Sequence, residues 1–208
     1  DPAYKAIHIW DQSTKQMKAI NISSIINYNT GGGTILGSFN HISAFTGFWV
    51  KANAVSQEVD VTNAHRTGLK DSLPPDTYFK AGFDIFRLTV KDAKDNIDQF
   101  SVCFKDDATE AMDNNLDIYK FKSFDDEVPT LYSVVDGDNL SLTAVPYLDN
   151  RVVPVYLENK TNGTEYTFSA QVSEYSMLYD VVLEDKKTGA TINILENDYK
   201  FLHDKTYT

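Results

Sequence analysis

FDIFRLTVKDAKDNIDQFSVCFK, residues 83–105, is the stretch that decides the fold class. Phe83–Val90 and Phe100–Lys105 are rich in aromatic and β-branched residues, which favour strands, and the Asp- and Asn-rich turn KDAKDNID separates them. The single cysteine, Cys103, lies in the second strand, where a small buried apolar residue is expected. Neither this stretch nor the sequence before it shows a 3.6-residue periodicity longer than two turns, so an all-β fold is predicted.

The sequence before this stretch predicts further strands. Tyr4–Trp10 and Gln16–Ile22 form a hairpin across a polar turn, Phe48–Ala52 alternates in polarity, and Val59–Val61 is a short strand. The loop at Gly31–Gly33 lacks the Lys-Ser/Thr pair and the helix of a phosphate-binding loop, so no nucleotide site is predicted there.

After residue 105 an acidic passage, DDATEAMDNNLDIYK at Asp106–Lys120, separates two runs of strands with different spacing. The second run has short strands at intervals of roughly 8–12 residues, which is typical of an immunoglobulin-like sandwich. Its predicted strands are Leu131–Val135, Leu140–Val145, Val152–Leu157, Tyr166–Val172, Asp180–Leu183, Thr191–Leu195 and Tyr199–Leu202. We therefore predict two antiparallel β-sandwich domains: a jelly-roll-like domain at residues 1–124 and an immunoglobulin-like domain at residues 125–208.

Composition excludes several classes of function. The 208 residues carry a net charge of −11 with no Lys/Arg-rich block, so no nucleic-acid partner is expected. No apolar run is long enough to span a bilayer, so no membrane insertion is expected. One cysteine forms no disulfide framework, the four histidines lack metal-site spacing, and no nucleophile motif occurs. No catalytic residues are predicted, and the chain is not expected to be an enzyme.

Nine short motifs, in this order, resemble one known module. They lie at Ala6–Asp11, Gly31–Gly33, Gly47–Ala52, Phe86–Val90, Phe104–Lys120, Val128–Ser133, Val153–Leu157, Gly163–Phe168 and Val182–Ile194. Together they resemble the β-rich module that precedes the C-terminal sorting domain in type IX-secreted surface proteins of Bacteroidetes. The resemblance implies a non-catalytic β region at an extracellular or outer-membrane surface, with neighbouring domains of a longer chain as partners. It assigns no activity to individual residues.

The acidic passage is the predicted metal site. Asp113, Asn115 and Asp117 have the oxygen spacing of the first half of an EF-hand loop, but the glycine at position six and the glutamate at position twelve are missing. These residues, with Asp107, are candidates for a calcium site of another geometry. The alternative is that the aspartates cap a turn and face water. A single helical turn is also expected over Ala108–Met112.

Trp10 and Trp49 are the candidate carbohydrate-binding residues, because an exposed indole can stack on the apolar C–H face of a sugar ring. The alternative is that GFWVKA, residues 47–52, is a strand buried on both sides. The preferred function is a non-catalytic extracellular segment of a cell-surface protein that acts in adhesion, spacing or presentation. The second is a carbohydrate-binding module that accompanies a polysaccharide-degrading enzyme, with a glycan or another cell-surface molecule as partner.

Overall fold

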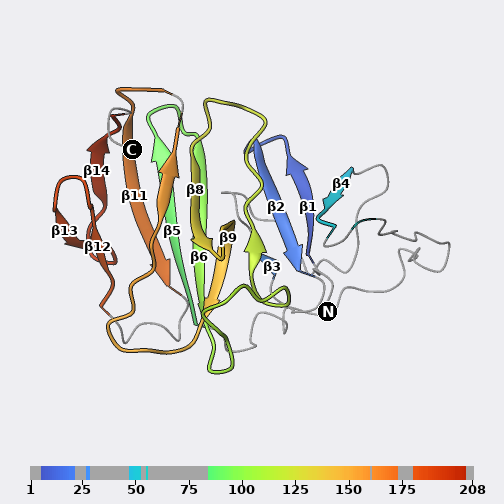
Figure 1. The fold of residues 1–208 in the computed structure, drawn as a ribbon. Helices are drawn as coiled ribbons and strands as arrows, with labels where there is room; N and C mark the ends of the chain where they lie inside the picture. The colour runs from blue at the N-terminus through green and yellow to red at the C-terminus, as the bar shows by residue number, and fades with distance from the viewer. Residues whose placement is uncertain are drawn as a thin grey trace, which may run out of the picture.

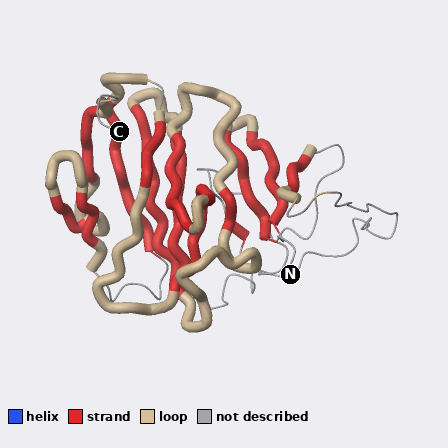
Figure 2. The backbone as a smooth tube through the Cα atoms, in the orientation of Figure 1, coloured by secondary structure: helices blue, strands red, loops and turns tan. Residues whose placement is uncertain are grey.

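The computed structural model describes residues 6–21, 27–28, 47–52, 55, 84–159, 161–172 and 180–204. All the regular secondary structure assigned within these ranges is β-strand, which confirms the all-β prediction (Figure 2). The predicted loop at Gly31–Gly33 and the predicted strand at Val59–Val61 lie outside the described residues.

The smaller of the two main sheets has four strands in the order β3 (Asn27–Tyr28), β2 (Gln16–Asn21), β1 (Ala6–Asp11) and β4 (Phe48–Val50). β1 and β2 form the predicted hairpin, and β4 joins the other side of β1 in antiparallel register. This sheet therefore brings residues 48–50 next to the start of the described chain.

The larger sheet is built around the two strands of residues 83–105. Its order is β10 (Tyr156–Glu158), β8 (Thr130–Val135), β9 (Asp138–Val145), β6 (Ile97–Phe104), β5 (Asp84–Asp92), β11 (Glu165–Val172) and β14 (Tyr199–Leu202), and β7 (Ile118–Tyr119) also pairs with β9. Strands β12 (Val182–Glu184) and β13 (Thr191–Asn193) form a separate hairpin. Figure 1 shows this hairpin at one side of the molecule and the four-stranded sheet at the other.

The larger sheet joins strands from both halves of the chain. β5 pairs with β11 in antiparallel register, and β6 pairs with β9 in parallel register. A parallel pair needs a crossover connection and not a tight turn, and residues 105–137, which include the acidic passage and β8, form it here. The sheet consequently continues across residues 124 and 125, where the sequence predicts a boundary between two domains.

The centre of the sheet is buried on both faces. One face carries Leu88, Val90, Phe100 and Val102, and the β12–β13 hairpin packs against this cluster through Leu183, Ile192 and the adjoining Ile194. The opposite face carries Cys103, Leu142 and Ala144, which contact Ala19 of β2. Cys103 is fully buried, as predicted. The four-stranded sheet and the β12–β13 hairpin thus cover opposite faces in a sandwich-like arrangement.

A two-residue turn joins β8 to β9. Asp136 and Gly137 have φ angles of 52° and 87°, the left-handed conformations that a type I′ hairpin turn requires. The Asp136 carboxylate also accepts a hydrogen bond of 2.9 Å from the backbone N–H of Met112, which ties the acidic passage to this turn.

An ion pair lies inside the larger sheet. Lys120, directly after β7, contacts the carboxylate of Asp98 on β6, and the two side chains are 3% and 0% exposed. The same carboxylate accepts a 2.6 Å hydrogen bond from the backbone N–H of Leu131 on β8. Asp98 therefore joins three segments of the chain at one buried point.

Candidate functional site

The candidate site begins on one face of the four-stranded sheet. His8 on β1 is directly opposite Trp49 on β4, so their side chains share a face, and Trp10 shares it because residues two apart in a strand point the same way. His8 is buried and stacks on Phe121, with 3.9 Å between ring centroids. Burial lowers the pKa of His8 to about 4, so this histidine is a neutral core ring at pH 7.

Phe124 connects the two tryptophans. Its ring centroid is 5.0 Å from that of Trp10 and 5.9 Å from that of Trp49, and the ring planes are inclined by 46° and 54°. Trp49 is 39% exposed and Phe124 is 65% exposed. Trp10, Trp49 and Phe124, which we call the aromatic cluster, therefore form a continuous surface of three rings that solvent reaches.

A shallow depression of about 420 Å³ lies against the aromatic cluster. Its lining consists of Trp10, Gln12, Lys15, Phe124, Asp125 and Asp126. The indole N–H of Trp10 donates a 3.0 Å hydrogen bond to Oε1 of Gln12, which fixes the ring against the β1–β2 turn. Since Oε1 accepts this bond, the NH₂ group of Gln12 is the part of the amide that can donate to a ligand.

Two contacts hold the segment that carries Phe124. The Lys15 ammonium lies 2.6 Å from Oδ2 of Asp125, and the Ser123 hydroxyl donates a 2.6 Å hydrogen bond to the carbonyl oxygen of Lys15. Oδ1 of Asp125 accepts a further bond of 3.0 Å from the N–H of Glu127. The hydrogen bond from Lys15 holds the pKa of Asp125 below its usual range, so this side of the depression carries a carboxylate at neutral pH.

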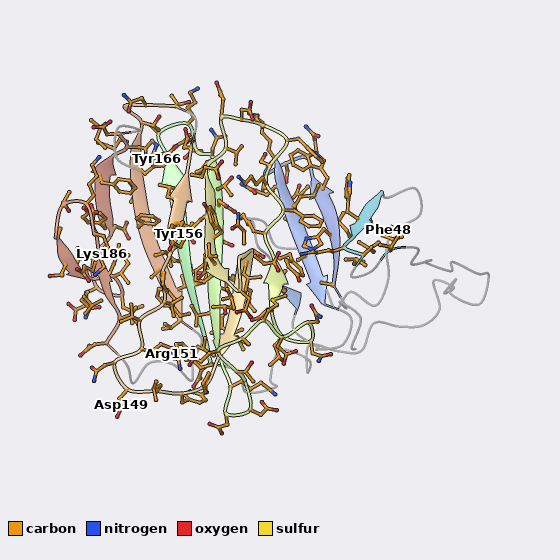
Figure 3. The ribbon with its side chains drawn as sticks, viewed as in Figure 1. Phe48, Asp149, Arg151, Tyr156, Tyr166 and Lys186 are labelled. Atoms are coloured by element: carbon orange, nitrogen blue, oxygen red, sulfur yellow. The ribbon has the colours of Figure 1, made fainter. Side chains whose placement is uncertain are left out.

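The opposite face of β4 carries Phe48 and Val50. Phe48 and Val50 are 38% and 43% exposed, and strand alternation places them on the face opposite to that of His8 and Trp49. Figure 3 labels Phe48 on β4, the edge strand of the four-stranded sheet. Lys51 follows the strand directly, and its Nζ lies 3.2 Å from Oδ1 of Asp138 and 3.1 Å from the centroid of the Tyr119 ring. Phe48 is therefore a neighbour of Trp49 with nearly equal exposure on the opposite face of the strand.

The structure brings both predicted carbohydrate-binding residues into the same cluster. Trp10 and Trp49 lie on paired strands and share Phe124 as a neighbour. The exposure of Trp49 contradicts the alternative that residues 47–52 are buried on both sides. Phe124 was not predicted as a site residue, although an aromatic side chain beside Asp125 and Asp126, in a segment without strand periodicity, was a usable signal.

The predicted metal residues Asp113, Asn115 and Asp117 lie in one turn before β7. Oδ2 of Asp117 accepts a 2.7 Å bond from the N–H of Asp113, and Oδ1 accepts a 2.7 Å bond from the N–H of Ala144 on β9. Oδ1 of Asp113 accepts a 2.8 Å bond from the N–H of Asn115. These bonds match the turn-capping alternative, except that Asp117 is buried. Burial raises the pKa of Asp117 to about 6, against the hydrogen bonds that lower it.

The prediction of a helical turn over Ala108–Met112 is wrong. These residues form no helical turn, and the turn lies at 113–117 instead, where the N–H of Asp117 donates to the carbonyl oxygen of Asp113 at 2.8 Å. The carboxylate of Asp113 caps the turn at 113–117, whereas the carboxylate of Asp107 contacts Lys105.

Calcium binding stays a prediction. Asp107 is exposed and pairs with Lys105, outside the turn that holds the other three predicted ligands. Across the part of the chain that the structure describes, no group of three or more His, Cys, Asp or Glu side chains is arranged to hold a metal ion. Within the same ranges no helix has the length and apolar character to cross a membrane.

Comparison with known proteins identifies a family. The model of a family described as a domain of unknown function, DUF8693, matches residues 4–208. No curated protein and no solved structure matches the chain.

Proposed function

The chain belongs to the family DUF8693, whose description assigns no function, and we propose that it is a non-catalytic glycan-binding segment of a cell-surface protein. The observation that carries the proposal is the aromatic cluster of Trp10, Trp49 and Phe124, exposed beside a depression with polar walls. Binding pockets for small molecules combine apolar contact area with a few placed polar groups, and this surface has both.

The chemistry of the depression suits a sugar. An aromatic ring offers a large apolar area with a negative face, which attracts the polarised C–H groups on one side of a pyranose. The carboxylates of Asp125 and Asp126 accept hydrogen bonds from hydroxyl groups, and the NH₂ group of Gln12 donates them. A sugar presents all three kinds of surface at once, which is why we prefer it to a purely apolar ligand.

The cellular setting of the proposal rests on the sequence. The resemblance to the module in type IX-secreted surface proteins implies an extracellular or outer-membrane location, where a glycan-binding segment would act in adhesion. In the second use of the same site, the segment binds a polysaccharide and thereby targets a neighbouring hydrolase domain to it. Both uses need the same binding event, so one binding experiment tests them together.

The experiment is affinity electrophoresis of the chain through gels that contain soluble polysaccharides, with Trp49→Ala as the test variant. Trp49 is 39% exposed, which corresponds to roughly 60–100 Å² of contact area and about 1.5–2.4 kcal/mol if a sugar covers it. We therefore expect Trp49→Ala to weaken retention about ten- to sixtyfold.

Phe48→Ala is the matched control. Phe48 precedes Trp49 in the same strand, has the same exposure and lies on the opposite face. It should leave retention unchanged, and both variants should remain folded at the temperature of the gel, as shown by a cooperative thermal melt above it. Equal losses of retention in both variants, or no retention of the parent chain on any polysaccharide, would refute the proposal.

A further inference from the structure

We propose that the aromatic cluster selects a single soluble chain of uncharged sugars, and that it rejects both the flat face of a crystalline polysaccharide and chains that carry carboxylate or sulfate groups. This inference rests on the proposed function and specifies its ligand. It follows from the inclination of the rings and from the charges beside them.

The inclination of the rings excludes a flat ligand. Phe124 is turned by 46° from Trp10 and by 54° from Trp49, and it is the most exposed of the three rings. A planar surface that lies flat on either indole therefore meets Phe124 at an angle and cannot contact both rings face to face. A single glycan chain has torsional freedom at each linkage, so successive sugars can turn to follow the rings.

The charges beside the rings exclude an acidic ligand. Asp125 and Asp126 line the depression, and Lys15, the cation in the same lining, is already paired with Asp125 at 2.6 Å. An incoming carboxylate or sulfate would meet a lining whose charged side chains sum to −1 and whose one cation already has a carboxylate partner. The net charge of −11 adds a long-range repulsion of the same sign.

The polar groups suit hydroxyls. A carboxylate accepts hydrogen bonds only, so Asp125 and Asp126 can take bonds from sugar hydroxyls, whereas an ionised uronic acid group has no proton to offer them. Gln12 supplies a donor on the other side of Trp10. An uncharged sugar, whose hydroxyls both donate and accept, satisfies both walls of the depression.

The test compares three ligands with the intact chain: soluble uncharged polysaccharides (mixed-linkage glucan, mannan and xylan), polygalacturonate, and microcrystalline cellulose. We expect retention on at least one uncharged polysaccharide, at least about tenfold weaker retention on polygalacturonate, and no adsorption to the crystals. Lowering ionic strength from 0.15 to 0.01 M lengthens the screening distance from about 8 to about 30 Å and should weaken polygalacturonate retention further.

Asp126→Asn removes one of the repelling charges and should raise the ratio of polygalacturonate to uncharged retention. Two outcomes would overturn the ligand class and leave the proposed function intact. One is binding of polygalacturonate at least as strong as that of uncharged polysaccharides, and the other is adsorption to cellulose crystals; in either case Trp49→Ala must abolish the binding. Absence of retention on all three ligands would instead refute the proposed function itself. The two failures are therefore distinguishable in the same set of gels and pull-downs.

Discussion

Replacing Lys120 with methionine tests whether the buried ion pair organises the larger sheet. The substitution keeps the length and apolar stem of the side chain and removes the charge that faces Asp98. Both side chains are almost completely inaccessible, so solvent cannot take over the role of the ammonium group. Removing one partner of a buried pair typically costs about 3–5 kcal/mol, because the remaining charge is left without compensation.

That loss is a large share of the roughly 5–15 kcal/mol that stabilises a typical folded domain. Urea unfolding followed by tryptophan fluorescence measures it. With a slope of about 3 kcal/mol/M, the unfolding midpoint should fall by about 1–2 M urea. Asp98 has a pKa raised by burial, so part of the loss will appear as uptake of a proton by Asp98 in the variant.

Lys122→Met is the matched control. Lys122 lies 2.6 Å from Glu158, but the two side chains are 50% and 46% exposed, and exposed pairs contribute about 0–1 kcal/mol. An organising role for the Lys120–Asp98 pair is refuted if Lys120→Met lowers the free energy of unfolding no more than Lys122→Met does. A double variant, Asp98→Leu with Lys120→Met, should be more stable than Lys120→Met alone, with about 1–3 kcal/mol still lost at the unpaired N–H of Leu131.

Three further predictions concern single side chains. The pKa of Asp117 is raised to about 6, so folding favours its protonated form. As pH falls from 7 to 4, the free energy of unfolding of the wild type should therefore rise by about 2–3 kcal/mol relative to that of Asp117→Asn; a constant difference in urea unfolding contradicts this. The pKa of His8 is lowered to about 4, so folding favours its neutral form. Over the same pH range the free energy of unfolding of the wild type should therefore fall by about 3 kcal/mol relative to that of His8→Phe; an unchanged difference would show that His8 titrates normally. An added Cβ meets no atom within 4 Å at Gly137 or at Gly47, but only Gly137 of the two has a positive φ, 87°. Gly137→Ala should therefore lower stability by about 1–2 kcal/mol in thermal melts and Gly47→Ala by less; equal losses would refute a left-handed requirement at the β8–β9 turn.

The strands were predictable because their signals are local. Phe83–Val90 became β5 at Asp84–Asp92, and the hairpin before it became β1 and β2, since alternation and turn residues act over a few positions. The short strands after residue 125 also appear close to their predicted places. The prediction of an all-β fold needed no information beyond this.

The sheet order was not predictable in the same way. Pairing of β6 with β9 and of β5 with β11 joins residues far apart in the sequence, and no local pattern marks a partner strand. The chain was therefore divided where the strand spacing changes, although hydrogen bonds cross that point. The helical turn expected at Ala108–Met112 did not form there, because the turn lies at residues 113–117, where the carboxylate of Asp113 accepts the N–H of Asn115.

Part of the candidate site was predictable. Trp10 and Trp49 were proposed from residue type and alternation, and the structure places both beside Phe124. Phe124 itself was missed because its contact with Trp10 spans more than a hundred residues of sequence. The capping role of Asp117 toward Ala144 was missed for the same reason, because it depends on where β9 runs.

The pairing of β5 with β11 has a consequence for synthesis of the chain. At roughly 5–20 residues per second, the ribosome takes roughly 3–14 s to make the stretch between the end of β6 and the end of β11. During that interval the β5 edge of the β5–β6 hairpin has no partner strand, because β11 is not yet made, whereas the β6 edge gains β9 earlier. Such edges pair readily with other chains. The nascent protein therefore passes through an aggregation-prone stage, and a chaperone that holds this hairpin should raise the yield of folded protein more than one that acts after release.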